Sequence, residues 1–250
     1  MKVKNILISQ PPPSDLEKSP YRDLAEKYNL KLEFHKFFKI EGIPAREFRL
    51  DRININDHNA IIFTSRLAVD HFFRIAKEMR AEIPDTLKYF CISEAIALYL
   101  QKYVQYRKRK IFHGKQQCPE LMDIILKHKE DKFLLPCSDI HKQDMSDLLD
   151  KYNIKYNKAI IYKTVDDDLS WIDIKKYDLL IFFSPSGVKS LLNNFPDFQQ
   201  ENILIAAFGD TTAKAIEEAN LTLHITAPTK VAPSMAMALE QYIIKLAKKK

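Results

Sequence analysis

The side chains best suited to chemistry in this 250-residue sequence are small hydroxyl groups that follow short apolar runs. Such runs are typical of buried strands, and a hydroxyl or glycine directly after one often begins the next helix. The first turn of a helix offers unpaired backbone N–H groups and a partial positive charge, which together bind carboxylates or phosphates. We therefore predict an anion-binding surface made by Thr64, Ser65, Ser93, Ser184, Ser186, Gly187, Gly209, Thr211 and Thr212.

The clustering of these residues carries the argument, because one Ser or Thr at a time is an ordinary helix cap. Gly187 and Gly209 strengthen it. The chain has only four glycines, and these two stand at expected strand-to-helix turns, where a missing Cβ lets a ligand or backbone approach closely. In open parallel α/β sheets, ligands bind beyond the carboxyl ends of the strands, where such turns gather.

Established catalytic motifs are missing from the sequence. It has no dinucleotide-binding glycine fingerprint, Walker lysine loop, zinc-protease motif or nucleophile elbow. The seven histidines lack metal-ligand spacing, so we expect no metal and no cofactor and assign the histidines structural or surface roles. His141 and Lys142, which follow an apolar run, are the exceptions to watch. A serine hydrolase using Ser65 or Ser184 is an alternative for which no partnered His and acid can be placed.

Composition narrows the classes of protein. The hydrophobic fraction of 46% is ordinary for a globular fold, and 39 Lys and Arg against 33 Asp and Glu give a net charge of +6, a mild bias toward anionic ligands. No basic stripe with interleaved aromatics points to nucleic acid, and no apolar stretch is long enough to span a membrane. Cys91 and Cys137 lie in apolar runs, where free thiols pack as small hydrophobes, so we expect a cytoplasmic protein.

Strand-like and helix-like segments alternate along the whole chain, which predicts an α/β fold with parallel sheets. The expected strands are 6–9, 32–34, 60–64, 89–92, 110–112, 133–136, 159–162, 179–183, 203–208 and 223–225. The clearest helix patterns, with apolar residues recurring at three and four, are 67–75, 95–103, 120–126, 145–152, 188–192, 212–219 and 235–244.

An internal repeat indicates two related lobes. Residues 63–69 recur at 182–188, residues 92–95 at 209–212, and residues 112–114 at 225–227, each before a helix pattern. We therefore expect two flavodoxin-like parallel-sheet lobes joined by a two-stranded linker, with an active-site cleft between them. Lobe 1 would be discontinuous and lobe 2 inserted into it. The expected bounds are 1–36 plus 166–250 for lobe 1, 40–160 for lobe 2, and 36–40 and 161–166 for the linkers.

Several motifs resemble those of the uroporphyrinogen-III synthase family over essentially the whole chain. They are Ile62-Phe63-Thr64-Ser65, Leu134-Leu135-Pro136-Cys137, Tyr162-Lys163-Thr164, Phe182-Phe183-Ser184-Pro185-Ser186-Gly187 and Ala207-Phe208-Gly209-Asp210-Thr211-Thr212-Ala213. The last two discriminate best, because their combination and spacing are hard to obtain by accident. The chain departs from the family at Ile92-Ser93-Glu94-Ala95, where the family often has a glycine turn, and at Ser9-Gln10, where an arginine is frequent.

The resemblance implies a reaction without a cofactor. Hydroxymethylbilane, a linear tetrapyrrole, loses its terminal hydroxyl, its last pyrrole ring is inverted through a spiro intermediate, and the ring closes as uroporphyrinogen III. The electron-rich pyrroles expel the hydroxyl themselves, so the enzyme mainly orients the reacting carbons and assists the departure of water.

The same resemblance assigns roles to residues. Tyr162 matches the family's linker tyrosine and would donate a hydrogen bond to the leaving hydroxyl; its alternative role is packing in the linker. Thr64, Ser65 and Ser93 of lobe 2 and the hydroxyls and glycines named above in lobe 1 would bind substrate carboxylates. We expect a monomer that receives its substrate from the preceding pathway enzyme. The alternative function is a non-enzymatic two-lobed protein that binds a small anion.

Overall fold

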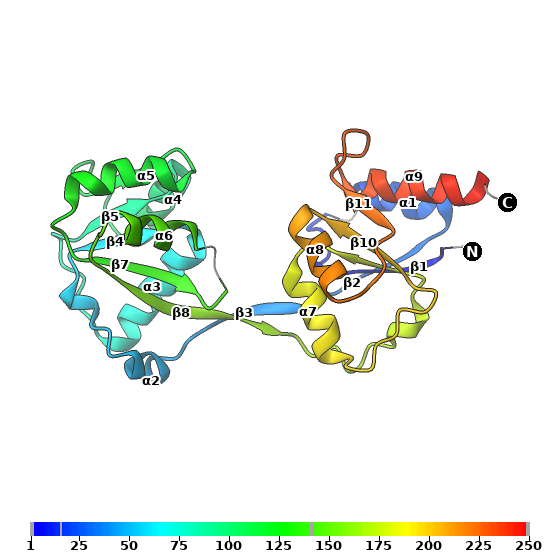
Figure 1. The fold of residues 1–250 in the computed structure, drawn as a ribbon, viewed down its shortest axis with the longest axis horizontal. Helices are drawn as coiled ribbons and strands as arrows, with labels where there is room; N and C mark the ends of the chain where they lie inside the picture. Colours follow the sequence, from blue (N-terminus) through cyan, green and yellow to red (C-terminus); the bar gives the residue numbers. More distant parts are fainter. Residues whose placement is uncertain (1–2, 16, 141–142, 249–250) are drawn as a thin grey trace. The chain divides into compact units, whose positions relative to one another are not determined.

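The computed structural model describes residues 3–15, 17–140 and 143–248. The chain forms two compact units, one made of residues 1–39 and 165–250 (unit 1) and the other of residues 40–164 (unit 2). Each unit is built on a β-sheet with helices on both faces (Figure 1), and the strands of each sheet are parallel except for β3 (Phe38–Gly42) at one edge of unit 2. The predicted α/β class is thereby confirmed.

Unit 2 is built on a six-stranded sheet in the order β3-β8-β7-β4-β5-β6. Its strands are β3 (Phe38–Gly42), β4 (Ala60–Phe63), β5 (Lys88–Cys91), β6 (Ile111–His113), β7 (Phe133–Ser138) and β8 (Tyr156–Asp166). Its helices are α2 (Ala45–Phe48), α3 (Arg66–Met79), α4 (Glu94–Tyr99), α5 (Cys118–Ile125) and α6 (Asp144–Lys151).

The central strand β4 explains why this sheet is covered on both faces. All four of its residues, Ala-Ile-Ile-Phe, are buried. Ile61 and Phe63 pack into the core under α3 and α4, whereas Ala60 and Ile62 pack into the core under α5 and α6. Alternation along a strand sends neighbouring side chains to opposite faces, so a continuous apolar run requires two layers of helices.

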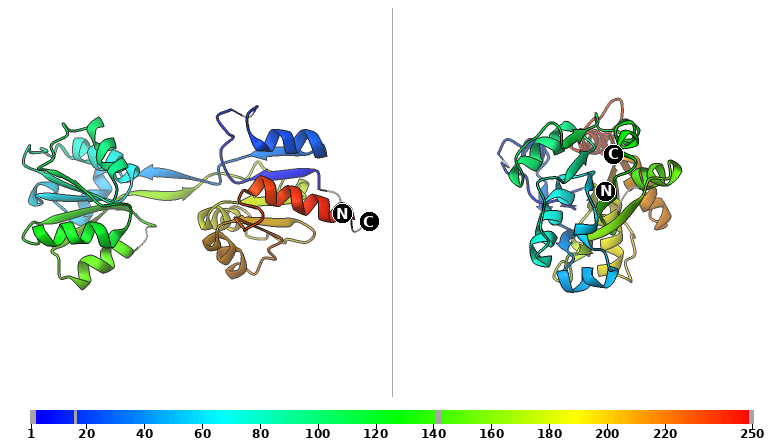
Figure 2. Two further views of the ribbon diagram at one scale, coloured as in Figure 1. Left: turned by 90° about the horizontal axis from the view of Figure 1, so that it is seen from above. Right: turned by 90° about the vertical axis from the view of Figure 1, so that its left-hand side faces the viewer.

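Unit 1 has a five-stranded parallel sheet in the order β11-β10-β9-β1-β2. Its strands are β1 (Asn5–Ile8), β2 (Lys31–Phe34), β9 (Leu179–Phe182), β10 (Leu204–Phe208) and β11 (Ile225–Ala227), and its helices are α1 (Pro20–Tyr28), α7 (Pro185–Asn194), α8 (Asp210–Glu218) and α9 (Met235–Lys248). Helices α1 and α9 lie side by side on one face (Figure 2), and α7 and α8 cover the other.

The two sheets share one topology. The order β8-β7-β4-β5-β6 in unit 2 corresponds to β2-β1-β9-β10-β11 in unit 1. The repeat predicted from sequence therefore pairs β4-α3 with β9-α7, β5-α4 with β10-α8, and β6-α5 with β11-α9. In unit 1, the two strands that complete this pattern come from the N-terminal segment of the chain.

The chain passes between the units in β3 and in β8, which are neighbours in the sheet. The Ile43 N–H donates to the Ile161 carbonyl over 3.0 Å, and the Asp167 N–H donates to the Phe37 carbonyl over 2.9 Å. From Phe37 to Ile43 the residue numbers rise, whereas those of their partners fall from Asp167 to Ile161, so the two strands run antiparallel. Strand β3 is missing from the strands predicted from apolar runs, because its side chains alternate between exposed and half-buried positions; sequence placed only a linker at 36–40 here.

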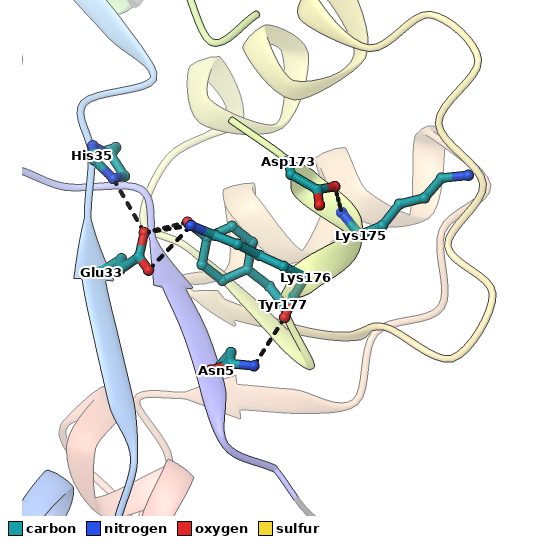
Figure 3. Close-up of polar contacts among 7 residues, drawn as sticks. All are labelled: Asn5, Glu33, His35, Asp173, Lys175, Lys176 and Tyr177. Atoms are coloured by element: carbon teal, nitrogen blue, oxygen red, sulfur yellow. Dashed lines mark hydrogen bonds and ion pairs between the residues drawn. The ribbon is translucent and has the colours of Figure 1, made fainter. Parts of the chain in front are cut away.

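Polar contacts hold the edge strand β2 of unit 1 in place (Figure 3). Glu33 accepts a hydrogen bond from the Tyr177 hydroxyl over 2.5 Å and pairs with the Lys176 ammonium over 3.1 Å. The Asn5 side-chain amide donates to the Lys176 carbonyl over 3.1 Å. These contacts connect β1 and β2 to the segment that leads into β9.

None of the described helices is long and apolar enough to cross a membrane.

Candidate functional site

A hollow of about 810 Å³ lies in unit 2 beside the carboxyl ends of its central strands. Thr64 and Ser65 follow β4, Tyr162 lies on β8, and all three line the hollow. Apolar side chains such as Leu135 and Met145 form part of the wall. Three of the residues predicted from sequence are therefore brought together, at the sheet edge where parallel α/β proteins bind ligands.

Ser65 has its position because it is the N-cap of α3. Its backbone is extended, with φ −154° and ψ 159°, and its hydroxyl accepts a hydrogen bond from the Ala68 N–H over 3.0 Å. The same oxygen lies 3.3 Å from the Tyr162 hydroxyl. Since a hydroxyl both donates and accepts, the pair can share a proton or present one toward the hollow.

Tyr162 is held in its protonated form. Its side chain is only 7% exposed, and this burial raises the pKa of the phenol; the nearby Asp139 and Cys137 act in the same direction, against the hydrogen bond with Ser65. A buried phenol with a raised pKa is a hydrogen-bond donor at neutral pH rather than a phenolate. Its ring stacks on His71, with centroids 4.8 Å apart and planes 19° apart.

In unit 1 the predicted residues gather at the starts of α7 and α8. Ser184 caps α7 with φ −157° and ψ 155° and accepts from the Gly187 N–H over 3.3 Å, which reproduces the geometry of Ser65. A Cβ on Gly187 would lie 3.3 Å from the Ser9 hydroxyl, so this turn has little space for a side chain. Ser186 is half-buried in the first turn of α7.

The two threonines at the start of α8 differ in exposure. Gly209 precedes the helix with φ 87°, a conformation that side chains rarely adopt. Thr211 is exposed, whereas Thr212 is only 1% exposed and its side chain turns into the fold. At this turn, the Thr211 hydroxyl and backbone N–H groups can meet a ligand, while the buried Thr212 side chain packs below them.

Comparison with known proteins identifies the family. The model of the family described as "Uroporphyrinogen-III synthase HemD" matches residues 37–236. The chain belongs to the uroporphyrinogen-III synthase family. This is an enzyme family of porphyrin and heme biosynthesis, and its substrate is a tetrapyrrole. The non-enzymatic binding protein is not favoured.

Two solved structures share the fold of this chain. Uroporphyrinogen-III synthetase from Helicobacter pylori is 19% identical, with a TM-score of 0.60, over 97% of this chain and 99% of that one. A mutant uroporphyrinogen III synthase from Thermus thermophilus is 14% identical, with a TM-score of 0.54, over 99% of this chain and 100% of that one. A search of curated protein sequences finds no match.

The remaining predicted residues lie outside the hollow or outside the described residues. Ser93 precedes α4, is 8% exposed and forms a backbone bridge with Lys115, and it is not one of the residues that line the hollow. His141 and Lys142 lie outside the described residues. Within the described ranges, no group of three or more His, Cys, Asp or Glu side chains is arranged to hold a metal ion.

His71 was not predicted to belong to the site, because the histidines were assigned structural or surface roles. The ring of His71 on α3 stacks on the ring of Tyr162 on β8, which lies far along the chain. A contact between residues so far apart in sequence cannot be predicted from local spacing. The only available signal was that the helix capped by Ser65 also carries His71.

Proposed function

We propose that this protein is a lyase that cyclises hydroxymethylbilane to uroporphyrinogen III, with inversion of the terminal pyrrole ring and loss of water. The observation that carries the proposal is the neutral Tyr162 phenol, which lines a large hollow beside Ser65 in a chain of this family. A fixed hydrogen-bond donor next to space for a bulky ligand suits a reaction whose first step is the departure of a hydroxyl.

The chemistry begins with the electron-rich pyrrole that carries the hydroxymethyl group, at one end of the linear chain. Its electrons push out the hydroxymethyl oxygen, the C–O bond breaks, and the oxygen leaves as water after it gains a proton. Tyr162 donates the hydrogen bond that assists this departure. The resulting azafulvene cation is attacked by a carbon of the pyrrole at the opposite end of the chain, which forms a spiro intermediate. Rearrangement inverts that ring, closes the macrocycle and releases a proton.

Control of conformation decides which product forms. A flexible substrate left to itself would close directly to the uninverted isomer, so the enzyme must favour one carbon attack over another. We propose that the helix starts bind the acetate and propionate carboxylates of the substrate through backbone N–H groups and hydroxyls. The positions assigned to this role are Thr64, Ser65, Ser93, Ser184, Ser186, Gly187, Gly209, Thr211 and Thr212, the last through its backbone N–H.

We also propose a functional division of the chain into lobes of 1–36 with 166–250 and of 40–160, joined by linkers at 36–40 and 161–166. A cytoplasmic location is supported by the free, buried thiols of Cys91 and Cys137. A monomer that takes hydroxymethylbilane from the preceding pathway enzyme completes the proposal.

The decisive experiment supplies purified protein with freshly made hydroxymethylbilane and resolves the oxidised products by isomer. Type III product in excess over a no-enzyme control supports the proposed reaction. Type I product alone, formed at the uncatalysed rate, rejects it. A protein that only binds the tetrapyrrole would leave the ratio of isomers unchanged.

A further inference from the structure

Arg74 on α3 is the centre of a hydrogen-bond network that surrounds Tyr162. Its Nε–H donates to the His71 Nδ1 over 3.2 Å, and its Nη2 donates to the carbonyls of Ile43 over 3.0 Å and Ile161 over 2.8 Å. Its Nη1 pairs with Glu78 over 2.7 Å. A guanidinium presents its donors in a rigid plane, so these four bonds fix the positions of their partners relative to one another.

The bond to His71 determines how that ring is protonated. Because Nδ1 accepts from Arg74, it carries no proton, and the neutral ring bears its hydrogen on Nε2. Burial lowers the pKa of His71, and the charge of Arg74 lowers it further against the opposing effects of Asp70 and Glu78. His71 is therefore a neutral ring of fixed orientation, and its face lies against the ring of Tyr162.

The bond to Ile161 acts on the backbone of the same tyrosine. The Ile161 carbonyl belongs to the peptide that leads into Tyr162, and it accepts from both the Ile43 N–H and Arg74. Arg74 therefore restrains Tyr162 in two ways, at its backbone directly and at its ring through His71. The contact with Ser65, at 3.3 Å, is long for two hydroxyls and is a weak restraint by itself.

Gly42 leaves the space that the guanidinium occupies. A Cβ at this position would lie 2.6 Å from both Cζ and Nε of Arg74, which is closer than real contacts allow. Among the described glycines only Gly209 has a positive φ, so the requirement at Gly42 is one of space and not of backbone conformation. A glycine in β3, an arginine and a histidine in α3, and a tyrosine in β8 thus form one arrangement.

We propose that Arg74 is a positioning residue for Tyr162, which it holds through His71 and the Ile161 carbonyl. The inference rests on the role of Tyr162 in the proposed function. A donor that assists the loss of a hydroxyl must point at one atom of the substrate, and a misplacement of about 1 Å can cost about 100-fold in rate. Arg74 touches no reacting atom; it determines where the phenol is.

The first test measures formation of type III product by Arg74→Met and by Arg74→Lys, which keeps the charge but loses the planar set of donors. We expect kcat to fall about 10-fold to 100-fold with KM changed by less than about 3-fold. Arg22→Met is the matched control, since Arg22 also pairs with a glutamate four residues later on its helix, at 2.8 Å. It should leave kcat unchanged.

The background of Tyr162→Phe separates positioning from general stability. There Arg74→Met should lower the residual rate by less than about 2-fold, because no phenol remains to be placed. An equal loss in both backgrounds would overturn the proposal. Gly42→Ala displaces the guanidinium without changing Arg74, so it should lower kcat when made alone. Combined with Arg74→Met, it should lower kcat little further. Losses that add fully in the double variant would count against the network.

A readout without turnover keeps this inference distinct from the proposed function. Nitrogen NMR of the His71 ring should show a protonated Nε2 and a bare Nδ1 in wild type, and a mixture of tautomers in Arg74→Met. If the protein makes no type III product but the tautomer is as expected, the proposed function fails and the network stands. If the product forms and the tautomer does not depend on Arg74, the network fails alone.

Discussion

The two units build the same strand-to-helix turn and surround it differently. Ser65 in unit 2 and Ser184 in unit 1 have nearly the same backbone angles and the same cap bond to the third residue of the helix. In unit 2, β8 continues past this level, and Tyr162 pairs with Ser138. In unit 1, β2 ends at Phe34, which pairs with Ile8, one residue before Ser9.

This difference in strand length decides what each turn can do. The long β8 brings a phenol to the cap serine, so the turn of unit 2 has a proton donor beside a hollow. At the turn of unit 1, the Ser9 hydroxyl is buried, has no hydrogen-bond partner among the residues that the structure describes, and packs near Gly187. We therefore propose that the same strand-to-helix turn takes part in chemistry in unit 2, where β8 extends past it, and only binds substrate in unit 1, where β2 stops short.

The largest expected effect is the loss of kcat on removal of the Tyr162 hydroxyl, which tests whether the turn of unit 2 takes part in the chemistry. Tyr162→Phe removes the donor but keeps the ring against His71, and it should lower kcat for type III product about 100-fold or more, the usual contribution of a positioned proton donor. Steady-state rates with isomer analysis measure this effect. Ser184→Ala in unit 1 is the counterpart; it should raise KM with little change in kcat, and equal losses of kcat would erase the proposed distinction.

A second prediction compares the turns that begin α8 and α4. Gly209→Ala places a side chain at φ 87°, where no neighbour blocks the Cβ but the backbone is strained, and it should cost about 1 to 3 kcal/mol. Ser93, the equivalent residue in unit 2, has φ −144° and makes no side-chain cap bond. Ser93→Ala should therefore destabilise less. Urea unfolding measures both, and equal losses would contradict the role of positive φ.

The serine caps of the two units should contribute equally to stability and differ in their effect on kcat. Ser65→Ala and Ser184→Ala each remove one hydroxyl that accepts from a helix N–H, and each should cost about 1 kcal/mol of stability. For a chain of this size, that loss lowers Tm by about 2 to 4 °C. Only Ser65→Ala should also lower kcat. Calorimetry beside activity assays separates the two effects.

The smallest expected effects concern pH. Burial lowers the pKa of His71 below its ordinary 6.5, so the unfolded chain binds this proton more readily than the folded protein. The stability from neutral His71 is present above pH 6.5 and is lost as the pH falls through the folded pKa. His71→Phe should therefore flatten the decline in Tm below pH 6.5. An unchanged slope would show that this ring does not titrate on unfolding.

Glu33 provides the unit 1 counterpart at lower pH. The hydrogen bond from Tyr177 opposes burial and, with Lys176, lowers the pKa of this carboxyl below 4.5. Its contribution to stability is present above pH 4.5 and is lost as the pH falls through the folded value. Tyr177→Phe should reduce that dependence while leaving the range near pH 6 unaffected. Tm measured across both ranges assigns each decline to one unit.

Much of the fold could be predicted because its elements are locally encoded. Apolar runs such as Ala60–Phe63 and Leu179–Phe182 mark the buried strands, and the recurrence of these units along the chain indicated the repeat. Strand β3 has no apolar run, so its bounds could not be predicted from one, and only a linker at 36–40 was expected there. The predicted helix at 95–103 proved shorter, since α4 ends at Tyr99 and continues as a 3-10 turn over Leu100–Lys102.

The candidate site was predictable only where its residues follow strands. Thr64, Ser65 and Tyr162 share one hollow, and their roles stay predictions. The burial of Thr212 had a signal, because Ile216 four residues later lies on the same face of α8 and is buried as well. The partners Gly42, His71 and Arg74 meet Tyr162 only through tertiary contacts between elements remote in sequence, and no local pattern contains that information.

The discontinuous course of unit 1 has a consequence for biosynthesis. Strand β1 lies in the interior of its sheet, between β2 and β9, and its apolar residues are buried. On the ribosome β1 emerges early and β9 late, whereas unit 2 is one contiguous segment that can fold in between. The nascent chain therefore carries an unsatisfied apolar strand throughout the synthesis of unit 2, and chaperone contact with the first 39 residues should persist until β9 has been translated.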